Sequence, residues 1–271
     1  MPGFDGAAAL RLGAGLALDD AFPDGTPVAF GFTTDGARPV APGLGAELGC
    51  APGACVGSAE GATVWACVGS AAGAEDVSGA GAAGVACAKM LIAAGVKDVV
   101  VLDSRGIIHP DRTPLNSVKS ELAEITNPRR IRGGITEALD GADTFIGLSR
   151  GHVGERELQR MAPDPILFSL ANPDPEIRPE LAYKYGAVVA TGRSDMPNQI
   201  NNVLAYPGVF HGALAAGAPK ITSAMKLAAS RAIADIVGDE LDAEHIVPSP
   251  LDTRVAPAVS AAVQAAAVTG Q

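Results

Sequence analysis

The chain is poor in basic residues, since 20 lysines and arginines face 30 aspartates and glutamates. A surface with this balance repels phosphate backbones and anionic lipid, so nucleic acid is excluded as an expected partner. Apolar runs of about 18 residues without a charge or a glycine-rich break are missing, and residues 1–18 lack the pattern of a secretory signal. We therefore expect a soluble, cytoplasmic protein that has no membrane partner.

Metal-binding patterns of cysteine and histidine are also missing. The four cysteines are Cys50, Cys55, Cys67 and Cys87, and no histidine precedes His109. None of these spacings matches the paired Cys-x-x-Cys or Cys/His arrangement of a zinc site. The sequence predicts reduced thiols without a structural metal.

Residues 1–77 contain no Lys, Tyr, His, Asn, Gln or Ile, although glycine, alanine and proline are abundant there. Strands favour β-branched and aromatic residues at alternate positions, and helices need apolar residues every three to four positions. Only residues 28–34 and 62–68 are plausible strands. We expect the rest of this N-terminal segment to be poorly structured.

From Ser78 onward, apolar helices and strands alternate regularly. This order predicts an α/β fold, a Rossmann-like doubly wound parallel sheet with helices on both faces, preceded by the poorly structured segment. The expected domains are residues 1–77 and a dinucleotide-binding domain of residues 78–271. The predicted helices are 85–94, ending at Gly95, 116–124, 220–236 and 256–267, and the predicted strands are 99–102, 144–148, 165–170 and 187–190.

A glycine fingerprint opens the first of these helices. Gly79, Gly81 and Gly84, with Ala82 and Ala83 between them, fit the pattern G-x-G-x-x-G. Its glycines allow a tight turn and the close approach of a pyrophosphate to bare backbone, and the helix N-terminus attracts the phosphates. The fingerprint predicts a dinucleotide site.

The elements around the fingerprint fit this prediction in part. The run 99–102 ends in Asp103, about 20 residues after Gly84, where a carboxylate accepts hydrogen bonds from a ribose diol. That carboxylate favours NAD over NADP, although Arg105 offers a charge to offset its repulsion of a 2′-phosphate. Before the fingerprint, the first strand is either very short, at Val77, or is supplied by residues 62–68 across a glycine-rich loop.

Amide side chains follow two of the predicted strands. Asn172 follows the segment 165–170 by two residues, and Asn201 and Asn202 lie near the end of the polar run 190–203. Asparagines are common turn formers, which is the plainer reading. The carboxyl ends of parallel strands are, however, where open α/β folds bind their ligands, and amides both donate to a carboxylate and accept from a hydroxyl. We expect these three residues to contact a small hydroxy acid.

Three motifs, residues 78–84, 168–173 and 190–212, occur in the same order as in the bacterial type of malic enzyme, which the segment 78–267 resembles. The resemblance implies oxidative decarboxylation of malate to pyruvate, with hydride transfer to NAD or NADP, a divalent Mg²⁺ or Mn²⁺ ion and a homodimer. It places the dinucleotide at the glycine fingerprint, Asp103 and Asn172. Malate and the nicotinamide ribose would contact Asn172, Asn201 and Asn202.

The N-terminal segment departs from that family, whose substrate domain supplies a catalytic tyrosine, a catalytic lysine and acidic metal ligands. Here the first lysine is Lys89 and the first tyrosine is Tyr183. We therefore assign no catalytic residue and no metal ligand to this chain, and interpret residues 1–77 as an irregular remnant of a substrate domain. An out-of-frame or deleted coding region and a divergent pseudoenzyme both explain this composition.

Two other functions remain open. The chain is alternatively a non-catalytic dinucleotide-binding or oligomer-forming module, or another nicotinamide enzyme such as an amino-acid dehydrogenase. The base of the latter would come from one of the four histidines or from Lys184 or Lys220. His211 has no carboxylate near it in the sequence, so we expect a surface residue or one that supports the site indirectly rather than a general base.

Overall fold

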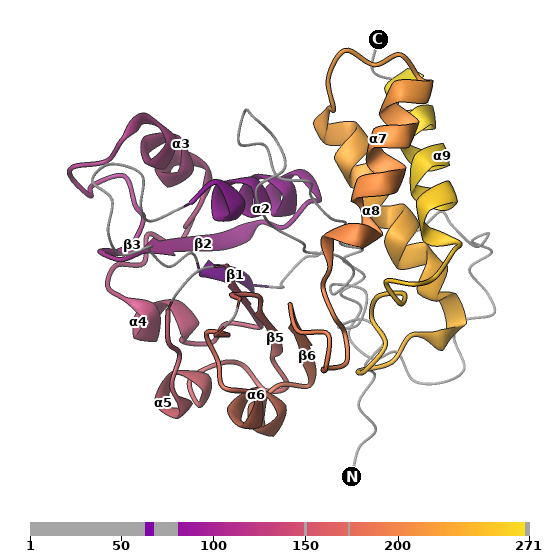
Figure 1. Ribbon diagram of the computed structural model, residues 1–271. Helices are drawn as coiled ribbons and strands as arrows, with labels where there is room; N and C mark the ends of the chain where they lie inside the picture. The colour runs from indigo at the N-terminus through magenta and orange to yellow at the C-terminus, as the bar shows by residue number, and fades with distance from the viewer. Residues whose placement is uncertain (1–62, 68–80, 149–150, 173, 269–271) are drawn as a thin grey trace, which may run out of the picture.

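The computed structural model describes residues 63–67, 81–148, 151–172 and 174–268, which form a six-stranded open sheet with helices around it (Figure 1). The strand order is β3-β2-β1-β4-β5-β6. All neighbouring strands are parallel except β3, which is antiparallel to β2. The strands are β1 Thr63–Cys67, β2 Asp98–Asp103, β3 Gly106–Ile107, β4 Thr144–Gly147, β5 Ile166–Ser169 and β6 Val188–Thr191.

The first strand, β1, lies in the middle of this sheet. Val64 pairs with Val99 of β2 on one side and with Thr144 of β4 on the other. Of the two expected origins of the first strand, the segment 62–68 is therefore the one found. The sheet thus contains residues that precede the expected domain boundary at residue 78, and the boundary itself stays a prediction.

Helices cover both faces of the sheet, which confirms the doubly wound fold (Figure 1). Side chains alternate along each strand, because successive residues of a strand point to opposite faces. Val99 and Val101 of β2 belong to one buried cluster, and Val100 and Leu102 belong to the other. One face carries α2 Ala82–Ala93 and α3 Ser117–Ile125, and the opposite face carries α4 Ile135–Leu139, α5 Glu155–Leu158 and α6 Pro179–Tyr185.

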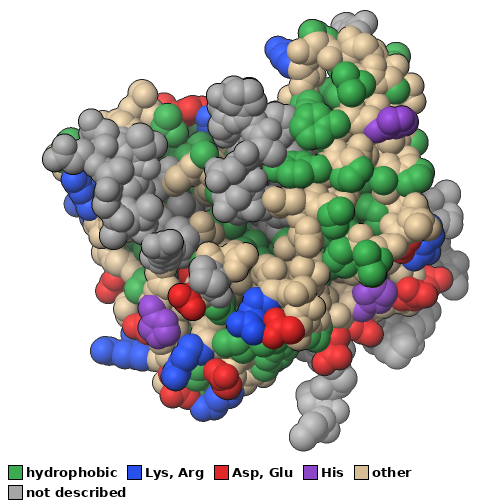
Figure 2. Space-filling model, in the orientation of Figure 1, with side chains coloured by type: hydrophobic (Ala, Val, Ile, Leu, Met, Phe, Trp, Pro, Cys, Tyr) green, Lys and Arg blue, Asp and Glu red, His purple; other side chains and the backbone are tan. Residues whose placement is uncertain are grey.

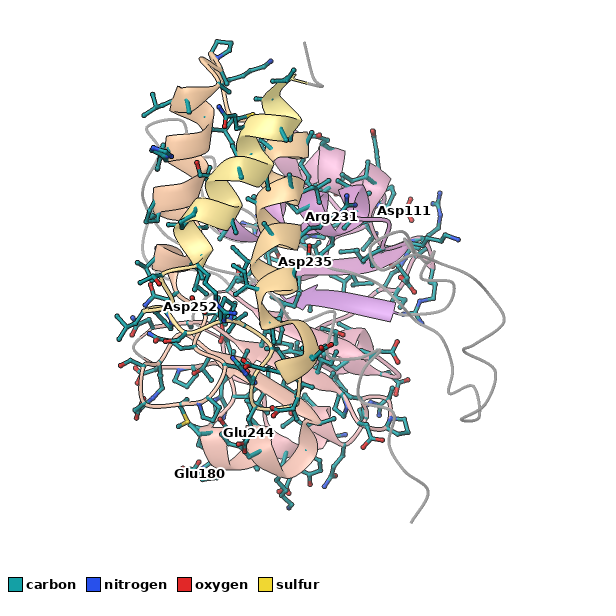
Figure 3. The ribbon with its side chains drawn as sticks, turned by 90° about the vertical axis from the view of Figure 1, so that its right-hand side faces the viewer. Asp111, Glu180, Arg231, Asp235, Glu244 and Asp252 are labelled. Atoms are coloured by element: carbon teal, nitrogen blue, oxygen red, sulfur yellow. The ribbon has the colours of Figure 1, made fainter. Side chains whose placement is uncertain are left out.

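The C-terminal helices that follow β6 form a bundle, which we call the helical arm, and its buried residues share one hydrophobic cluster with those of α2 (Figure 1). On α8, Ile233 is fully buried, whereas Arg231 and Asp235 lie on the exposed side (Figure 3). This one-sided burial is that of an amphipathic helix. The arm comprises η1 Asn202–Leu204, α7 Tyr206–Ala215, α8 Ser223–Val237, η2 Gly238–Glu240 and α9 Val255–Val268.

Helix α7 packs against α9 through two glycines. A Cβ atom at Gly208 would lie 2.5 Å from the Cβ of Val259, and one at Gly212 would lie 2.4 Å from the carbonyl oxygen of Ser260. The two helices therefore approach so closely that a methyl group does not fit between them. The sequence did not predict α7 as a helix, because glycines weaken helices unless packing compensates.

All predicted helices, and the predicted strands that lie within the described residues, are found within three residues of their expected bounds. The short elements β3, α4, α5 and α6 were not predicted. The predicted strand 28–34 and most of the segment 1–77 lie outside the described residues. Among the residues that the structure does describe, no helix is long and apolar enough to span a membrane.

Candidate dinucleotide site

The N-terminus of α2 is built to receive an anion. Its N-cap is Gly81, which has no side chain to cap the helix, and the first turn contains no acidic residue. Among the described residues, none lies within 4 Å of a Cβ atom built at Gly81, so none of them fills the space beside the helix N-terminus. The unpaired amides and the positive end of the helix dipole attract a phosphate at such a position.

The remaining fingerprint residues lie around this turn. Ala82 and Ala83 begin α2, and Gly84 is buried in its first turn. Gly79 lies outside the described residues. Strand β1 has β2 on one side and β4 on the other, so the order of the strands reverses beside it. Ligands of open α/β sheets bind at this reversal, outside the carboxyl ends of the strands.

Asp103 ends β2 and forms the centre of an ionic cluster. Its Oδ1 accepts a hydrogen bond from the backbone N–H of Arg105 at 2.8 Å. Its Oδ2 accepts from the guanidinium of Arg112 and from the Nζ of Lys119, the latter at 2.9 Å. The Asp103 side chain is 1% exposed, against 12% and 14% for those of Arg112 and Lys119. The two cations thus lie nearer to solvent than the carboxylate does.

The ionisation of Asp103 follows from this cluster. Burial alone would raise its pKa, because burial disfavours the charged form. Hydrogen bonds from Arg112, Lys119 and the Arg105 amide outweigh that effect, so the pKa of Asp103 lies below its ordinary range. The carboxylate is therefore ionised, but both of its oxygens are already engaged within the chain. The Arg105 side chain is exposed beside the cluster.

Asn172 follows the carboxyl end of β5 and is exposed, and its contact with a ligand stays a prediction. Glu176 lies four residues further along the chain and is only 3% exposed. Its Oε2 accepts hydrogen bonds from Ser169 Oγ at 2.9 Å and from the backbone N–H of Ala171 at 3.2 Å. Nothing in the sequence pattern indicated Glu176.

Asn198 anchors the polar loop after β6 through buried hydrogen bonds. This residue is buried with a φ of +53°, and its amide donates to the carbonyls of Val189 and Ala243 at 2.9 and 2.8 Å. The Oδ1 atom of Asn201 accepts from the Val203 N–H at 3.0 Å and so caps η1. Asn201 therefore has the turn-forming role that its residue type suggested. Asn201 and Asn202 are both half-buried.

The strand register brings these polar segments to one edge. Ser169 at the end of β5 is paired with Thr191 at the end of β6. Asn172 follows the first of these residues, and the loop to Asn201 and Asn202 follows the second. The three predicted contact residues thus lie in segments that leave neighbouring strands at their carboxyl ends, and their contact with a ligand stays a prediction.

Two of the alternative bases considered from sequence, His211 and Lys184, make contacts that join parts of the chain. His211 is exposed, and its Nδ1 lies 2.8 Å from Ser260 Oγ, which joins α7 to α9. Lys184 is exposed, and its Nζ lies 2.5 Å from Glu155 Oε1. The Tyr183 hydroxyl lies 3.7 Å from the sulfur of Met196. The His211 contact and the exposed Lys184 pair both bind parts of the chain to one another.

The divalent ion implied by the resemblance finds no fitting site among the described residues. Within residues 63–67, 81–148, 151–172 and 174–268, no group of three or more His, Cys, Asp or Glu side chains could hold a metal. The carboxylates labelled in Figure 3, such as Asp111, Glu180 and Glu244, come from separate loops and helices. We therefore derive no chemical step through a metal ion.

Comparison with known proteins gives one consistent result. Residues 74–269 match the family model described as malic enzyme, NAD binding domain. An NAD-dependent malic enzyme of Geobacillus stearothermophilus is 49% identical over 197 residues, which are 72% of this chain and 41% of that protein. A bifunctional malic/malolactic enzyme of Bacillus subtilis is 51% identical over 195 residues, which are 70% of this chain and 48% of that protein.

Solved structures agree with the sequence matches. The NAD-dependent malic enzyme of Thermotoga maritima superposes with a TM-score of 0.66 at 44% identity, over 74% of this chain and 51% of that one. The malic enzyme of Pyrococcus horikoshii gives a TM-score of 0.68 at 41% identity, over 77% of this chain and 48% of that one. The chain thus spans about half the length of the relatives that it matches. It belongs to the malic enzyme family, and residues 74–269 match that family's NAD-binding domain.

Proposed function

We propose that this chain binds NAD or NADP across the carboxyl edge of its sheet and belongs to an oxidoreductase that converts malate to pyruvate by oxidative decarboxylation. The observation that carries the proposal is the uncapped, open N-terminus of α2 at Gly81, beside the point where the strand order reverses. Family membership supplies the reaction class. Both NAD-dependent and NADP-dependent enzymes are among its relatives.

The residues of this edge have separate tasks in the proposal. The α2 N-terminus binds the pyrophosphate, which places the adenosine half towards β2 and the nicotinamide half towards β4 and β5. Asn172, Asn201 and Asn202 contact malate and the nicotinamide ribose, and thereby orient the C2 hydrogen of malate. When bound, the nicotinamide supplies the hydride acceptor.

The Asp103 cluster bears on the choice between the two cofactors. One carboxylate is paired there with two cations that lie closer to solvent, and Arg105 is exposed beside them. The cluster carries a net positive charge, so its repulsion of a 2′-phosphate is offset. We infer that the chain accepts NADP as well as NAD. The two cations thus weaken the preference for NAD over NADP that Asp103 alone predicts.

Catalysis by the chain alone is a different matter. Malate oxidation needs a base for the C2 hydroxyl and an acid for the enolate, and neither Lys184 nor His211 is placed for such a role. We propose that the chain alone binds the cofactor without turning over malate. A non-catalytic dinucleotide-binding module is the second candidate, favoured by the lack of a metal-binding group among the described residues.

Two assays on the purified chain test these proposals. Titration of NADH, followed by its fluorescence, is expected to saturate, and the absence of binding at millimolar cofactor would contradict the proposed site. Malate with Mn²⁺ or Mg²⁺ and NAD is expected to give no NADH above background. Turnover on the order of 1 s⁻¹, within the ordinary range of enzymes, would show that the chain is catalytically complete.

We also propose that the chain forms a homo-oligomer. Figure 2 shows apolar side chains gathered on the helical arm, where Phe210 and Leu214 of α7 are 37% and 79% exposed. Exposed apolar faces of this kind mark association surfaces. Light scattering coupled to size exclusion tests the proposal, and a mass of 27.2 kDa, that of one chain, would contradict it.

A further inference from the structure

Glu176 is a buried carboxylate that the proposed chemistry does not use. It lies where the chain turns back from β5, four residues after Asn172, and is 3% exposed. Its Oε2 accepts the Ser169 hydroxyl and the Ala171 N–H, and Ser169 Oγ in turn accepts the N–H of Ile177 at 2.9 Å. These bonds close the loop between Ser169 and Ile177 upon itself.

The end of β4 is shaped around this carboxylate. Gly147, the last residue of β4, leaves the space that Glu176 occupies, since a Cβ atom there would lie 2.4 Å from the Glu176 carboxyl carbon. The Leu170 N–H donates to the Gly147 carbonyl at 3.0 Å, so the ends of β4 and β5 stay paired up to the loop. Glu176 thus lies between the two strand ends that border the nicotinamide side of the proposed site.

The burial of a carboxylate between the ends of β4 and β5 requires an explanation. Burial of a charge is costly unless hydrogen bonds compensate for the lost water, so an apolar side chain would fill the same space more cheaply. Glu176 accepts two such bonds, from the Ser169 hydroxyl and from the Ala171 amide, and Ala171 directly precedes Asn172. The Glu176 carboxylate therefore controls the backbone from which Asn172 projects.

We propose that Glu176 is a positioning residue, which holds Asn172 through Ser169 and the Ala171 amide at the nicotinamide side of the site. The inference rests on the proposed function and names a residue that acts in it. Loss of Glu176 should weaken the binding of the nicotinamide half of the cofactor. It should leave the adenosine half unaffected, because that half lies on the other side of the strand reversal.

Four variants test the proposal. Glu176→Ala removes the carboxylate, and Glu176→Gln keeps an oxygen that accepts the same two hydrogen bonds. Gly147→Ala displaces the carboxylate without altering Glu176 itself. Thr144→Val is the matched control, because Thr144 lies at the other end of β4 with a buried hydroxyl that has no partner in the described structure. For each variant, dissociation constants for NADH and for ADP are measured, together with the hydrogen exchange of the Ala171 amide.

The expected pattern is selective. Glu176→Ala and Gly147→Ala should weaken NADH by about tenfold, the effect of losing one or two hydrogen bonds of ordinary strength, while ADP binding stays unchanged. Exchange of the Ala171 amide should accelerate in both, and Glu176→Gln and Thr144→Val should resemble the wild type.

Three results would overturn the proposal. The first is equal weakening of NADH and ADP, which indicates general damage to the fold, and the second is unchanged NADH binding in Glu176→Ala. The third is hydrogen exchange of the Ala171 amide that stays slow in both Ala variants. This exchange measurement needs no cofactor, so it tests directly whether Glu176 orders the loop. Failure of the wild type to bind NADH would instead contradict the proposed function.

Discussion

Replacement of Asp103 by asparagine removes one charge from the end of β2 and keeps the shape of the side chain. The carboxylate of Asp103 is 1% exposed and is hydrogen-bonded to Arg112 and Lys119. In Asp103→Asn these two cations lose the Asp103 carboxylate that both of them contact. We therefore expect the variant to be markedly less stable than the wild type.

The size of the effect follows from burial. Removal of one partner from a buried ion pair costs about 3–5 kcal/mol, because the remaining charge is buried without compensation. Arg112 and Lys119 retain 12% and 14% exposure, so water relieves part of that cost and we expect about 3 kcal/mol. For a chain of this size the melting temperature should fall by on the order of 10 °C.

Urea unfolding followed by circular dichroism measures this difference. Asp111→Asn is the matched control, since Asp111 pairs with Arg132 at the surface, where both side chains are more than half exposed. The control should unfold like the wild type. If Asp103→Asn also unfolds at the wild-type urea concentration, the cluster does not contribute to stability as described. In the same variant NADPH should gain affinity relative to NADH, and an unchanged preference would show that the cluster does not face the ribose.

Further predictions concern the helical arm, the Asp103 cluster and the Cys87 thiol. Gly212→Ala places a Cβ atom 2.4 Å from the Ser260 carbonyl oxygen, so thermal unfolding should show a loss of about 1–3 kcal/mol, and an unchanged melting temperature would show that α7 and α9 can separate. The lowered pKa of Asp103 stabilises the fold above about pH 4, the unfolded value, and this contribution disappears as the pH falls through the lower folded pKa. Urea midpoints measured across acid pH should therefore fall more steeply in the wild type than in Asp103→Asn, and parallel curves would contradict the shift. Lys119→Ala should weaken NADPH more than NADH in titrations, whereas equal effects would place Lys119 away from the 2′-phosphate. Burial raises the pKa of the Cys87 thiol to about 12, so mass spectrometry should find it unmodified by iodoacetamide until the chain unfolds, and rapid labelling of the folded chain would contradict its burial.

The sequence predicted the sheet well because its strands are buried on both faces. The residues 99–102 and 166–169 form continuous apolar or small-residue runs, as parallel strands covered by helices require. The glycine fingerprint likewise indicated where α2 begins, because bare backbone at a helix N-terminus needs glycine. Patterns within a few residues of one another were sufficient for these elements.

Other features depend on contacts between distant parts of the chain. The fit of Gly208 against Val259 decides that α7 is a helix, and no local pattern encodes it. The partners of Asp103 lie nine and 16 residues further along the chain, and they meet only after α3 packs beside the sheet. The place of Glu176 beneath Asn172 depends on the space that Gly147 leaves on a neighbouring strand. These residues were missed because their roles exist only in the folded chain.

The most direct test of the account is NADH binding by the wild type and by Gly81→Val. Gly81 has an ordinary φ of −63°, and a Cβ atom there meets none of the described residues within 4 Å, so we expect the larger side chain to be accommodated. It would, however, occupy the space through which the pyrophosphate approaches α2. The account predicts saturable binding to the wild type and a loss of about tenfold or more in Gly81→Val at a nearly unchanged melting temperature. Equal binding by the two proteins, or no binding by the wild type, would contradict it.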